Sequence, residues 1–318
     1  MSPLRVVIPF AQVDKDQNPN ARKASAEAQQ EAYARAIAVT FASVRRWNPD
    51  AILTLATNGE AHPLTTQVFV DCNVEVDRFD FEHTVPKGFM PTFAGCLFIF
   101  DALARYADQD ALYLDPDILC VGALDPLVAG CATGVSALPM SFPHTETVNG
   151  VLHEDARQIL RDLGVDHFEG FFGGEAYFVP ATLGRDFFDR SERIFRGSVR
   201  QFEQGRPHLV TEEHMLSGVV SRMPHVSMAP WARRIWTASR YRTVLGDERD
   251  LLLWHLPAEK DTGFAGLFET VADRTSWFWT APREEYLNRS AKAMSIRHRT
   301  LKKVLRDVLG RTARSLGR

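Results

Sequence analysis

Cysteine is scarce in this sequence. The four cysteines, Cys72, Cys96, Cys120 and Cys131, lie far apart, and no two of them form a Cys-x-x-Cys pair. This spacing predicts neither a zinc knuckle nor a disulfide framework. The cysteines are therefore interpreted as buried free thiols of a protein in a reducing compartment.

Long apolar runs are also absent. The N-terminal stretch MSPLRVVIPFAQ turns polar after a run that is too short for the core of a signal peptide. No other run approaches the length that crosses a bilayer. The sequence therefore predicts a cytoplasmic protein.

The composition excludes fibrous and disordered classes of protein. With 318 residues, of which 45% are hydrophobic, the chain can bury one large α/β core, alone or with a small appendage. Collagen, coiled coil and bulk disorder require compositions that this chain does not have.

The most informative stretch is ALYLDPDILCVGALDPL, residues 111–127. A short apolar run ends at Asp115 and Asp117, which flank Pro116, and a second apolar run follows. On a regular strand the two carboxylates would share a face, and close carboxylates repel unless a cation lies between them. A divalent ion that also binds phosphate oxygens meets this need. A turn rich in Asp and Pro is the alternative interpretation.

This stretch resembles the YLDxDxxVxxDxxxL stretch of GT-A type nucleotide-sugar glycosyltransferases, most of all glycosyltransferase family 8. The resemblance implies that Asp115 and Asp117 hold a manganese ion on the diphosphate of a UDP-sugar. It also implies that Tyr113 and Asp115 lie at the donor site, while Asp125 matches a downstream acidic residue with a structural role.

The beginning of the chain predicts a strand, a helix and a strand, at Leu4–Pro9, Ser25–Trp47 and Ala51–Ala56. This order indicates a right-handed parallel unit of an α/β protein. The family resemblance implies the GT-A (Rossmann-like) fold, with a mixed, mostly parallel sheet flanked by helices. Leu64–Phe81 is interpreted as either an edge strand or a loop.

Nucleotides usually bind at loops that follow the first strand of such a sheet. The resemblance implies that Pro9, Ala11 and Gln12 contact the donor there, although the chain lacks the Asp-x-Tyr of many family 8 enzymes. The predicted helix Phe93–Tyr106 has Gly95 where those enzymes carry an arginine that reaches the donor. Lys87 is a candidate to replace that arginine.

A second informative stretch is HFEGFFGGEAYFVP, residues 167–180. Gly173 and Gly174 allow a backbone to approach a ligand closely, and Ala176–Val179 is a predicted strand. A simple turn is the alternative. The stretch resembles the F-x-G-G segment of glycosyltransferase family 6, which lies under the donor sugar and the acceptor.

The third stretch, TEEHMLS at residues 211–217, resembles D-E-S-H-L-N of family 6 and D-Q-D-x-L-N of family 8. The resemblance places Glu212 and Glu213 near the reacting carbon, and Glu213 matches the proposed nucleophile of family 6. A carboxylate can capture or stabilise an oxocarbenium-like centre. Thr211 followed by two glutamates is also a good helix N-terminus. Both interpretations can hold.

The fourth stretch, LLLWHLPAEK at residues 251–260, is an apolar strand that ends in a histidine. It resembles H-Y-x-G-x-x-K-P-W of family 8, which implies that His255 is the third metal ligand and that Lys260, one position early, holds the diphosphate. A structural histidine is the alternative. A histidine beside two carboxylates suits Mn²⁺ better than Mg²⁺.

The C-terminal segment is basic. From Arg289 to Arg318 there are ten Lys or Arg and one acid, whereas the whole chain has a net charge of −3. We expect a GT-A domain at residues 1–280 and a basic helical extension at 281–318. The extension either binds an anionic membrane surface, on the inner face of a membrane, or packs on the domain. Nucleic-acid binding is not expected.

Together these stretches predict a retaining, metal-dependent glycosyltransferase, with Mn²⁺ or Mg²⁺ as cofactor. It would move a hexose from a UDP-sugar to a glycan or lipid-linked acceptor. Two alternatives stay open. One is a catalytically silent module that binds a sugar nucleotide or a glycan, and the other is a metal-dependent nucleotidyltransferase or phosphotransferase.

Overall fold

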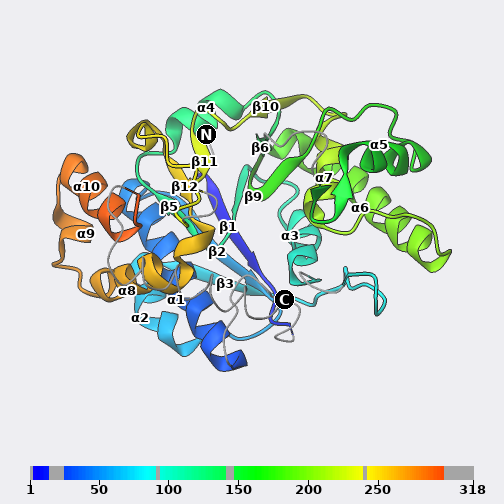
Figure 1. Ribbon diagram of the computed structural model, residues 1–318. Helices are drawn as coiled ribbons and strands as arrows, with labels where there is room; N and C mark the ends of the chain where they lie inside the picture. The colour runs from blue at the N-terminus through cyan, green and yellow to red at the C-terminus, as the bar shows by residue number, and fades with distance from the viewer. Residues whose placement is uncertain (1–2, 14–24, 91–93, 141–146, 239–241, 297–318) are drawn as a thin grey trace, which may run out of the picture.

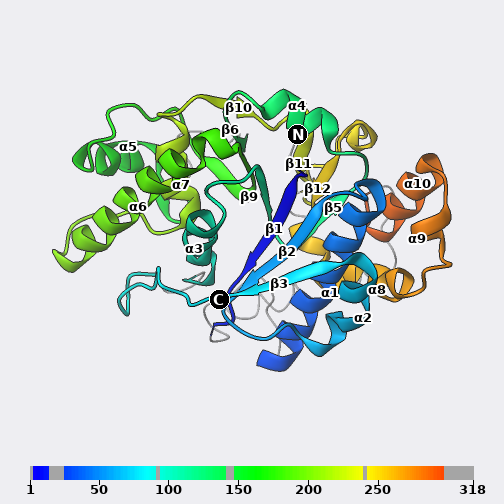
Figure 2. The same ribbon diagram turned by 180° about the vertical axis from the view of Figure 1, so that it is seen from behind.

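The computed structural model describes residues 3–13, 25–90, 94–140, 147–238 and 242–296 (Figure 1). A seven-stranded sheet runs through the middle, and helices cover both of its faces (Figures 1 and 2). Its strands, in spatial order, are β10 (His225–Ser227), β6 (Val135–Pro139), β9 (Phe172–Val179), β4 (Ala111–Leu114), β1 (Arg5–Phe10), β2 (Ile52–Thr57) and β3 (Val74–Arg78). Strand β9 is antiparallel to β4 and β6, and the other neighbours are parallel. The predicted mixed, mostly parallel sheet is confirmed.

Two smaller sheets and the helices complete the architecture. The three-stranded sheet contains β11 (Ala232–Arg234), β12 (Leu253–His255) and β5 (Ile118–Cys120), and the two-stranded one contains β7 (Thr147–Val148) and β8 (Val151–Leu152). The helices are α1 (Ala26–Trp47), α2 (Thr66–Cys72), α3 (Phe98–Arg105), α4 (Asp125–Cys131), α5 (His153–Asp162), α6 (Ala181–Glu203), α7 (Glu212–Val220), α8 (Ala265–Ala272), α9 (Trp277–Thr280) and α10 (Arg283–Ala293).

The central sheet divides the hydrophobic core into two parts. On β1, Val6 and Ile8 belong to the part of the core that also contains residues of α1, α2, α8 and α10, whereas Val7 belongs to the part with residues of α3, α6 and α7. Alternate residues of a strand point to opposite faces, so β1 supplies both parts. Because helices cover both faces, the inner strands β4 and β9 are almost entirely buried. The edge strand β3 carries charged residues and is mostly exposed.

The predicted opening unit is confirmed. The Ser25 side chain caps α1 by accepting a hydrogen bond from the Ala28 backbone N–H at 3.1 Å, and the helix ends at Trp47. Strands β1 and β2 are parallel. Within Leu64–Phe81, the edge-strand interpretation is correct for β3, while α2 precedes it and was not predicted.

The apolar run after Asp117 forms β5, which belongs to the three-stranded sheet and pairs there with β12. One predicted helix needs correction. The helix predicted at Phe93–Tyr106 is shorter, since a 3₁₀ turn occupies Ala94–Leu97 and α3 begins at Phe98. Gly95 therefore lies in the turn.

Helix α10, the last one in the described ranges, packs into the part of the core that contains α1. Tyr286 of α10 is fully buried, contacts Trp47 of α1 edge to face, and donates a hydrogen bond to the Cys120 carbonyl at 3.2 Å. Residues 297–318 of the predicted basic helical extension lie outside the described residues, so the division at residue 280 stays a prediction. None of the helices in the described ranges has the length and apolarity that a membrane-spanning helix needs.

Candidate active site

Asp115, Asp117 and His255 converge at one point of the structure. Each offers one ligand atom, and these atoms all lie within 4.8 Å of one another. The pairing of β5 with β12 explains the convergence, because His255 is directly opposite Ile118. The backbone N–H of Leu256 also donates to the Asp117 carbonyl at 3.0 Å. The predicted grouping of these three residues in space is therefore present.

The two aspartates do not lie on a regular strand, as the spacing argument assumed. They belong to a turn between β4 and β5, which is the alternative that Asp and Pro favour. The turn is fixed from both sides. Thr40 of α1 donates its hydroxyl hydrogen to the Pro116 carbonyl at 2.7 Å, and the Asp115 N–H donates to the Glu175 carbonyl at 2.8 Å.

The three side chains differ in exposure and in charge environment. The Asp115 side chain is 44% exposed, whereas that of Asp117 is fully buried. His255 Nε2 lies 3.5 Å from one oxygen of each carboxylate. Burial and the neighbouring Asp117 raise the pKa of Asp115, while the Lys260 and His255 charges outweigh burial and hold the pKa of Asp117 well below its usual range.

This group of side chains fits a divalent cation. Asp117 Oδ1 is buried and has no hydrogen-bond partner among the residues that the structure describes. A buried carboxylate oxygen is costly to leave unpaired, and a metal ion removes that cost. Two carboxylates and one imidazole nitrogen form a mixed oxygen and nitrogen ligand set of the kind that Mn²⁺ accepts. Asp115, Asp117 and His255 are therefore the candidate ligands.

Lys260 lies beside this group, in a π-helical turn at Lys260–Phe264. Its ammonium group is buried and forms an ion pair with Asp117 Oδ2. The same nitrogen lies 5.6 Å from the centre of the Tyr33 ring. Burial alone would lower the pKa of Lys260, but the Asp117 charge outweighs it and raises the pKa. Lys260 therefore places a permanent positive charge at the candidate metal site.

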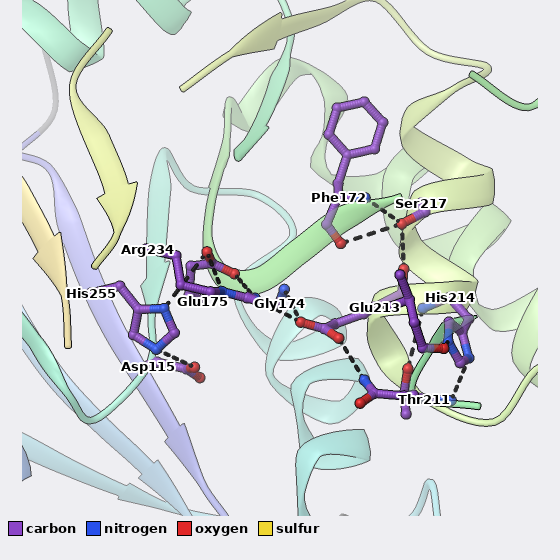
Figure 3. Close-up of polar contacts among 12 residues, drawn as sticks. Asp115, Phe172, Gly174, Glu175, Thr211, Glu213, His214, Ser217, Arg234 and His255 are labelled. Atoms are coloured by element: carbon purple, nitrogen blue, oxygen red, sulfur yellow. Dashed lines mark hydrogen bonds and ion pairs between the residues drawn. The ribbon is translucent and has the colours of Figure 1, made fainter. Parts of the chain in front are cut away.

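Glu213 is held by several donors at the start of α7 (Figure 3). Its carboxylate accepts hydrogen bonds from Asn149 Nδ2 at 2.7 Å, from Arg234 Nη2 at 2.9 Å and from the Gly174 N–H at 3.1 Å. The predicted helix start is confirmed, because Thr211 caps α7 by accepting a hydrogen bond from the His214 N–H. Such a carboxylate is fixed in one orientation.

Glu212 has different surroundings. It is half-buried, and its Oε2 has no hydrogen-bond partner in the described part of the chain. Burial, followed by the neighbouring Glu213 charge, raises the pKa of Glu212. A carboxyl group in this state carries a proton that it can donate to a ligand. The two adjacent glutamates thus offer one protonated group and one fixed carboxylate.

Gly173 and Gly174 make room for these acidic side chains. A Cβ atom on Gly173 would lie 1.9 Å from Glu175 Oε2, and one on Gly174 would lie 2.6 Å from Glu212 Oε1. Larger residues at either position would displace a carboxylate. In this structure the space beside both glycines is filled by side chains of the protein.

Of the residues predicted to contact the donor after β1, Pro9 lies level with Asp115 when the parallel register of β1 and β4 is extended. The Gln12 backbone N–H donates to Asn58 at 2.6 Å, which ties it to the loop after β2. The Tyr113 side chain is 2% exposed and belongs to the core on the α3 side of the sheet, as does the 3% exposed Ala11. The proposed replacement for the missing arginine, Lys87, is exposed in a turn.

The motifs did not identify two charged residues of the site. Glu175 on β9 is 2% exposed and pairs with Arg234 on β11, which also contacts Glu213 (Figure 3). The available signal was the acidic residue at the start of the apolar strand EAYFV, because charged residues are rarely buried unless they are paired. No comparable feature of the sequence around Arg234 indicates that it belongs to the site.

Comparison with family models and with curated proteins finds no match to this sequence. Solved structures do match. The galactosyltransferase LgtC, in complex with donor and acceptor sugar analogues, has 16% identity and a TM-score of 0.50, and the match covers 89% of this chain and 99% of LgtC. LgtC is a family 8 glycosyltransferase. This chain has the GT-A fold.

Two further glycosyltransferases share this fold. GlyE of Streptococcus pneumoniae TIGR4 has 13% identity and a TM-score of 0.51, over 91% of this chain and 65% of GlyE. The bifunctional WbbM has 12% identity and a TM-score of 0.54, over 91% of this chain and 52% of WbbM. The resemblance to GT-A glycosyltransferases, and to family 8 among them, is confirmed for the fold.

Proposed function

We propose that this protein is a retaining, metal-dependent glycosyltransferase that moves a hexose from a UDP-sugar to a glycan or lipid-linked acceptor. The convergence of Asp115, Asp117 and His255 beside the end of a central strand carries the proposal. On a GT-A fold, such a group lies where the carboxyl ends of the strands open toward a nucleotide.

The metal site accounts for departure of the diphosphate. Asp115, Asp117 and His255 would hold Mn²⁺ or Mg²⁺, which supplies Lewis-acid stabilisation of the leaving phosphate oxygens. Lys260 adds a fixed positive charge next to Asp117. Because Lys260 is buried, little water weakens its charge, so it acts strongly on the diphosphate.

The two glutamates of α7 account for the sugar side of the reaction. The fixed carboxylate of Glu213 is oriented by Asn149, Arg234 and Gly174 and stabilises positive charge that develops at the anomeric carbon. The protonated Glu212 donates a hydrogen bond to a sugar hydroxyl. Retention of anomeric configuration and the choice of UDP rest on the resemblance to families 6 and 8.

The basic segment from Arg289 to Arg318 suggests where the acceptor is used. A lipid-linked acceptor lies at a membrane, and a run of Lys and Arg is attracted to anionic lipid headgroups. The proposal therefore includes a peripheral position on the cytoplasmic face of a membrane. Release of the protein from anionic vesicles by salt would support this part of the proposal.

Release of UDP tests the activity. The protein is incubated with a set of UDP-hexoses and Mn²⁺, and free UDP is measured with and without glycan acceptors. Asp117→Ala should lower UDP release at least ~100-fold because it removes a metal ligand. Asp162→Ala, an exposed position at the end of α5, is the matched control and should leave the rate unchanged.

The same assay separates the alternatives. Release of pyrophosphate or inorganic phosphate without UDP would identify a nucleotidyltransferase or phosphotransferase instead. Saturable binding of a UDP-sugar without any product would identify a binding module. Either result would overturn the proposed transfer reaction.

A further inference from the structure

A pair of charged side chains, Glu175 and Arg234, lies between the candidate metal ligands and Glu213 (Figure 3). We propose that this pair positions both halves of the active site, with Glu175 orienting the metal ligand His255 and Arg234 joining Glu175 to Glu213. The inference rests on the proposed metal-dependent function and adds two positioning residues to it.

Glu175 faces the second nitrogen of the His255 ring. Its Oε1 lies 3.6 Å from His255 Nδ1, and that nitrogen is buried with no hydrogen-bond partner among the described residues. A histidine that binds a metal through Nε2 carries its proton on Nδ1. A carboxylate on the Nδ1 side favours this tautomer, fixes the ring and makes the nitrogen ligand more basic.

Arg234 holds Glu175 in place. Its Nε donates to Glu175 Oε1 at 3.0 Å, and its Nη2 donates to Oε2. Two parallel hydrogen bonds from one guanidinium define the plane of the carboxylate as well as its position. Because Glu175 is 2% exposed, it would be an uncompensated buried charge without this partner.

The same guanidinium reaches the other half of the site. Arg234 Nη2 also donates to Glu213 Oε1 at 2.9 Å. One side chain therefore links the carboxylate behind His255 to the carboxylate that we place near the sugar. A shift of Arg234 would move both.

Gly173 provides the room that this pair requires. A Cβ atom there would lie 1.9 Å from Glu175 Oε2 and 2.8 Å from Arg234 Nη2. Any other residue at this position would therefore displace the ion pair. The first glycine of the Gly-Gly sequence has a role within the protein that does not require a ligand.

Binding of Mn²⁺ alone tests the inference. Free Mn²⁺ is measured by electron paramagnetic resonance as the metal is titrated into the protein. Glu175→Gln keeps the shape of the side chain but removes its charge, and it should weaken Mn²⁺ binding about 10- to 100-fold. Glu248→Gln is the matched control, because Glu248 is also a buried glutamate and accepts hydrogen bonds from the backbone of Leu245 and Gly246. It should leave the affinity unchanged.

A second substitution guards against misfolding of the first. Glu175→Asp keeps the charge opposite Arg234 but withdraws the carboxylate from His255 by one methylene, and it should weaken Mn²⁺ binding at least about fivefold. Mn²⁺ affinity within about twofold of the unsubstituted protein, in whichever of the two variants is folded, overturns the positioning role.

The titration also distinguishes this inference from the proposed function. If the unsubstituted protein binds no Mn²⁺, the metal-dependent function and the positioning role fail together. If it binds Mn²⁺ and the Glu175 variants bind equally well, the positioning role fails alone.

Discussion

Glu213 accepts hydrogen bonds from three donors, whereas one carboxylate oxygen of its neighbour Glu212 has none among the described residues. The difference arises because consecutive residues of a helix point in different directions. Glu213 meets Asn149 and Arg234, whereas Glu212 lies beside Cys96 and next to the Glu213 charge. Removing the charge at Glu213 and at Glu212 should therefore change the rate of UDP release by different amounts.

Substitution of each glutamate by glutamine should show this difference. Glu213→Gln removes a fixed negative charge and should lower the rate of UDP release about 10²- to 10³-fold. Glu212→Gln replaces a group whose raised pKa already keeps it neutral, so the fall should be smaller, about tenfold. Initial rates with Mn²⁺ and saturating UDP-hexose measure both, and the reverse order would contradict the assignment.

Residues of the metal site could be predicted together because they lie in stretches with a known pattern. Asp115, Asp117, His255 and Lys260 all came from such stretches, and the structure brings them together. Arg234 could not be predicted, because its role depends on how closely β11 approaches β9. A local sequence pattern cannot indicate a contact between two strands that are far apart in the chain.

At the scale of elements, α6 packs through a glycine against the turn that follows α3. A Cβ atom on Gly184 would lie 2.0 Å from the Ala107 carbonyl oxygen, which is backbone and cannot move aside easily. Gly184→Ala should therefore lower the free energy of unfolding by about 1–3 kcal/mol. Urea denaturation followed by circular dichroism measures the change.

Gly266 of α8 is the matched control for this substitution. Nothing lies within 4 Å of a Cβ atom built there, and the residue is exposed in a helix. Gly266→Ala should be neutral or should raise the free energy of unfolding by up to about 1 kcal/mol. Equal effects of the two alanines would show that packing of α6 on α3 does not depend on the glycine.

His83 connects its own loop to two helices. Its Nδ1 lies 2.6 Å from Asp101 of α3, and its Nε2 lies 2.5 Å from Glu192 of α6. Burial alone would lower the pKa of His83, but the Asp101 and Glu192 charges outweigh it and raise the pKa. The resulting stability is fully present below the unfolded pKa of about 6.5 and is lost as pH rises through the folded pKa.

Replacement of His83 by glutamine should therefore have a pH-dependent effect. His83→Gln should cost about 3 kcal/mol at pH 6, because it leaves the buried Asp101 charge without its cationic partner, and the cost should shrink as the pH is raised toward 9. Urea denaturation of both proteins at several pH values measures the cost. A cost that grows with pH would contradict a protonated His83.

Elements with strong periodicity, such as α1, could be predicted with nearly correct bounds. The short helix α2 was missed because seven residues hold too few turns to establish a periodic pattern. The sheet to which β5 belongs could not be predicted, for another reason. Its partner β12 lies more than a hundred residues later in the chain, and the local sequence does not indicate which distant strand will pair with it.

At the scale of the whole molecule, the proposed ligands should stabilise the fold. A ligand that binds the folded state alone raises the free energy of unfolding by about 2.7 kcal/mol at a concentration of 100 Kd. For a protein of this size, Mn²⁺ with UDP should therefore raise Tm by about 5 °C. Differential scanning fluorimetry measures the shift.

Asp117→Ala should abolish this shift in Tm because it removes one of the three candidate ligands. Asp162→Ala, on the surface of α5, should retain it. A shift of the same size in Asp117→Ala would place the bound ligands elsewhere on the protein.

The turn at residues 115–117 belongs to the central sheet on one side and to the three-stranded sheet on the other, which also carries His255. The ligands are consequently divided between two sheets. If the three-stranded sheet loosens on heating before the central sheet unfolds, the ligands move apart while the central sheet remains folded. Catalysis would then disappear at a temperature below that of global melting, and a bound cation would bring the two temperatures closer together.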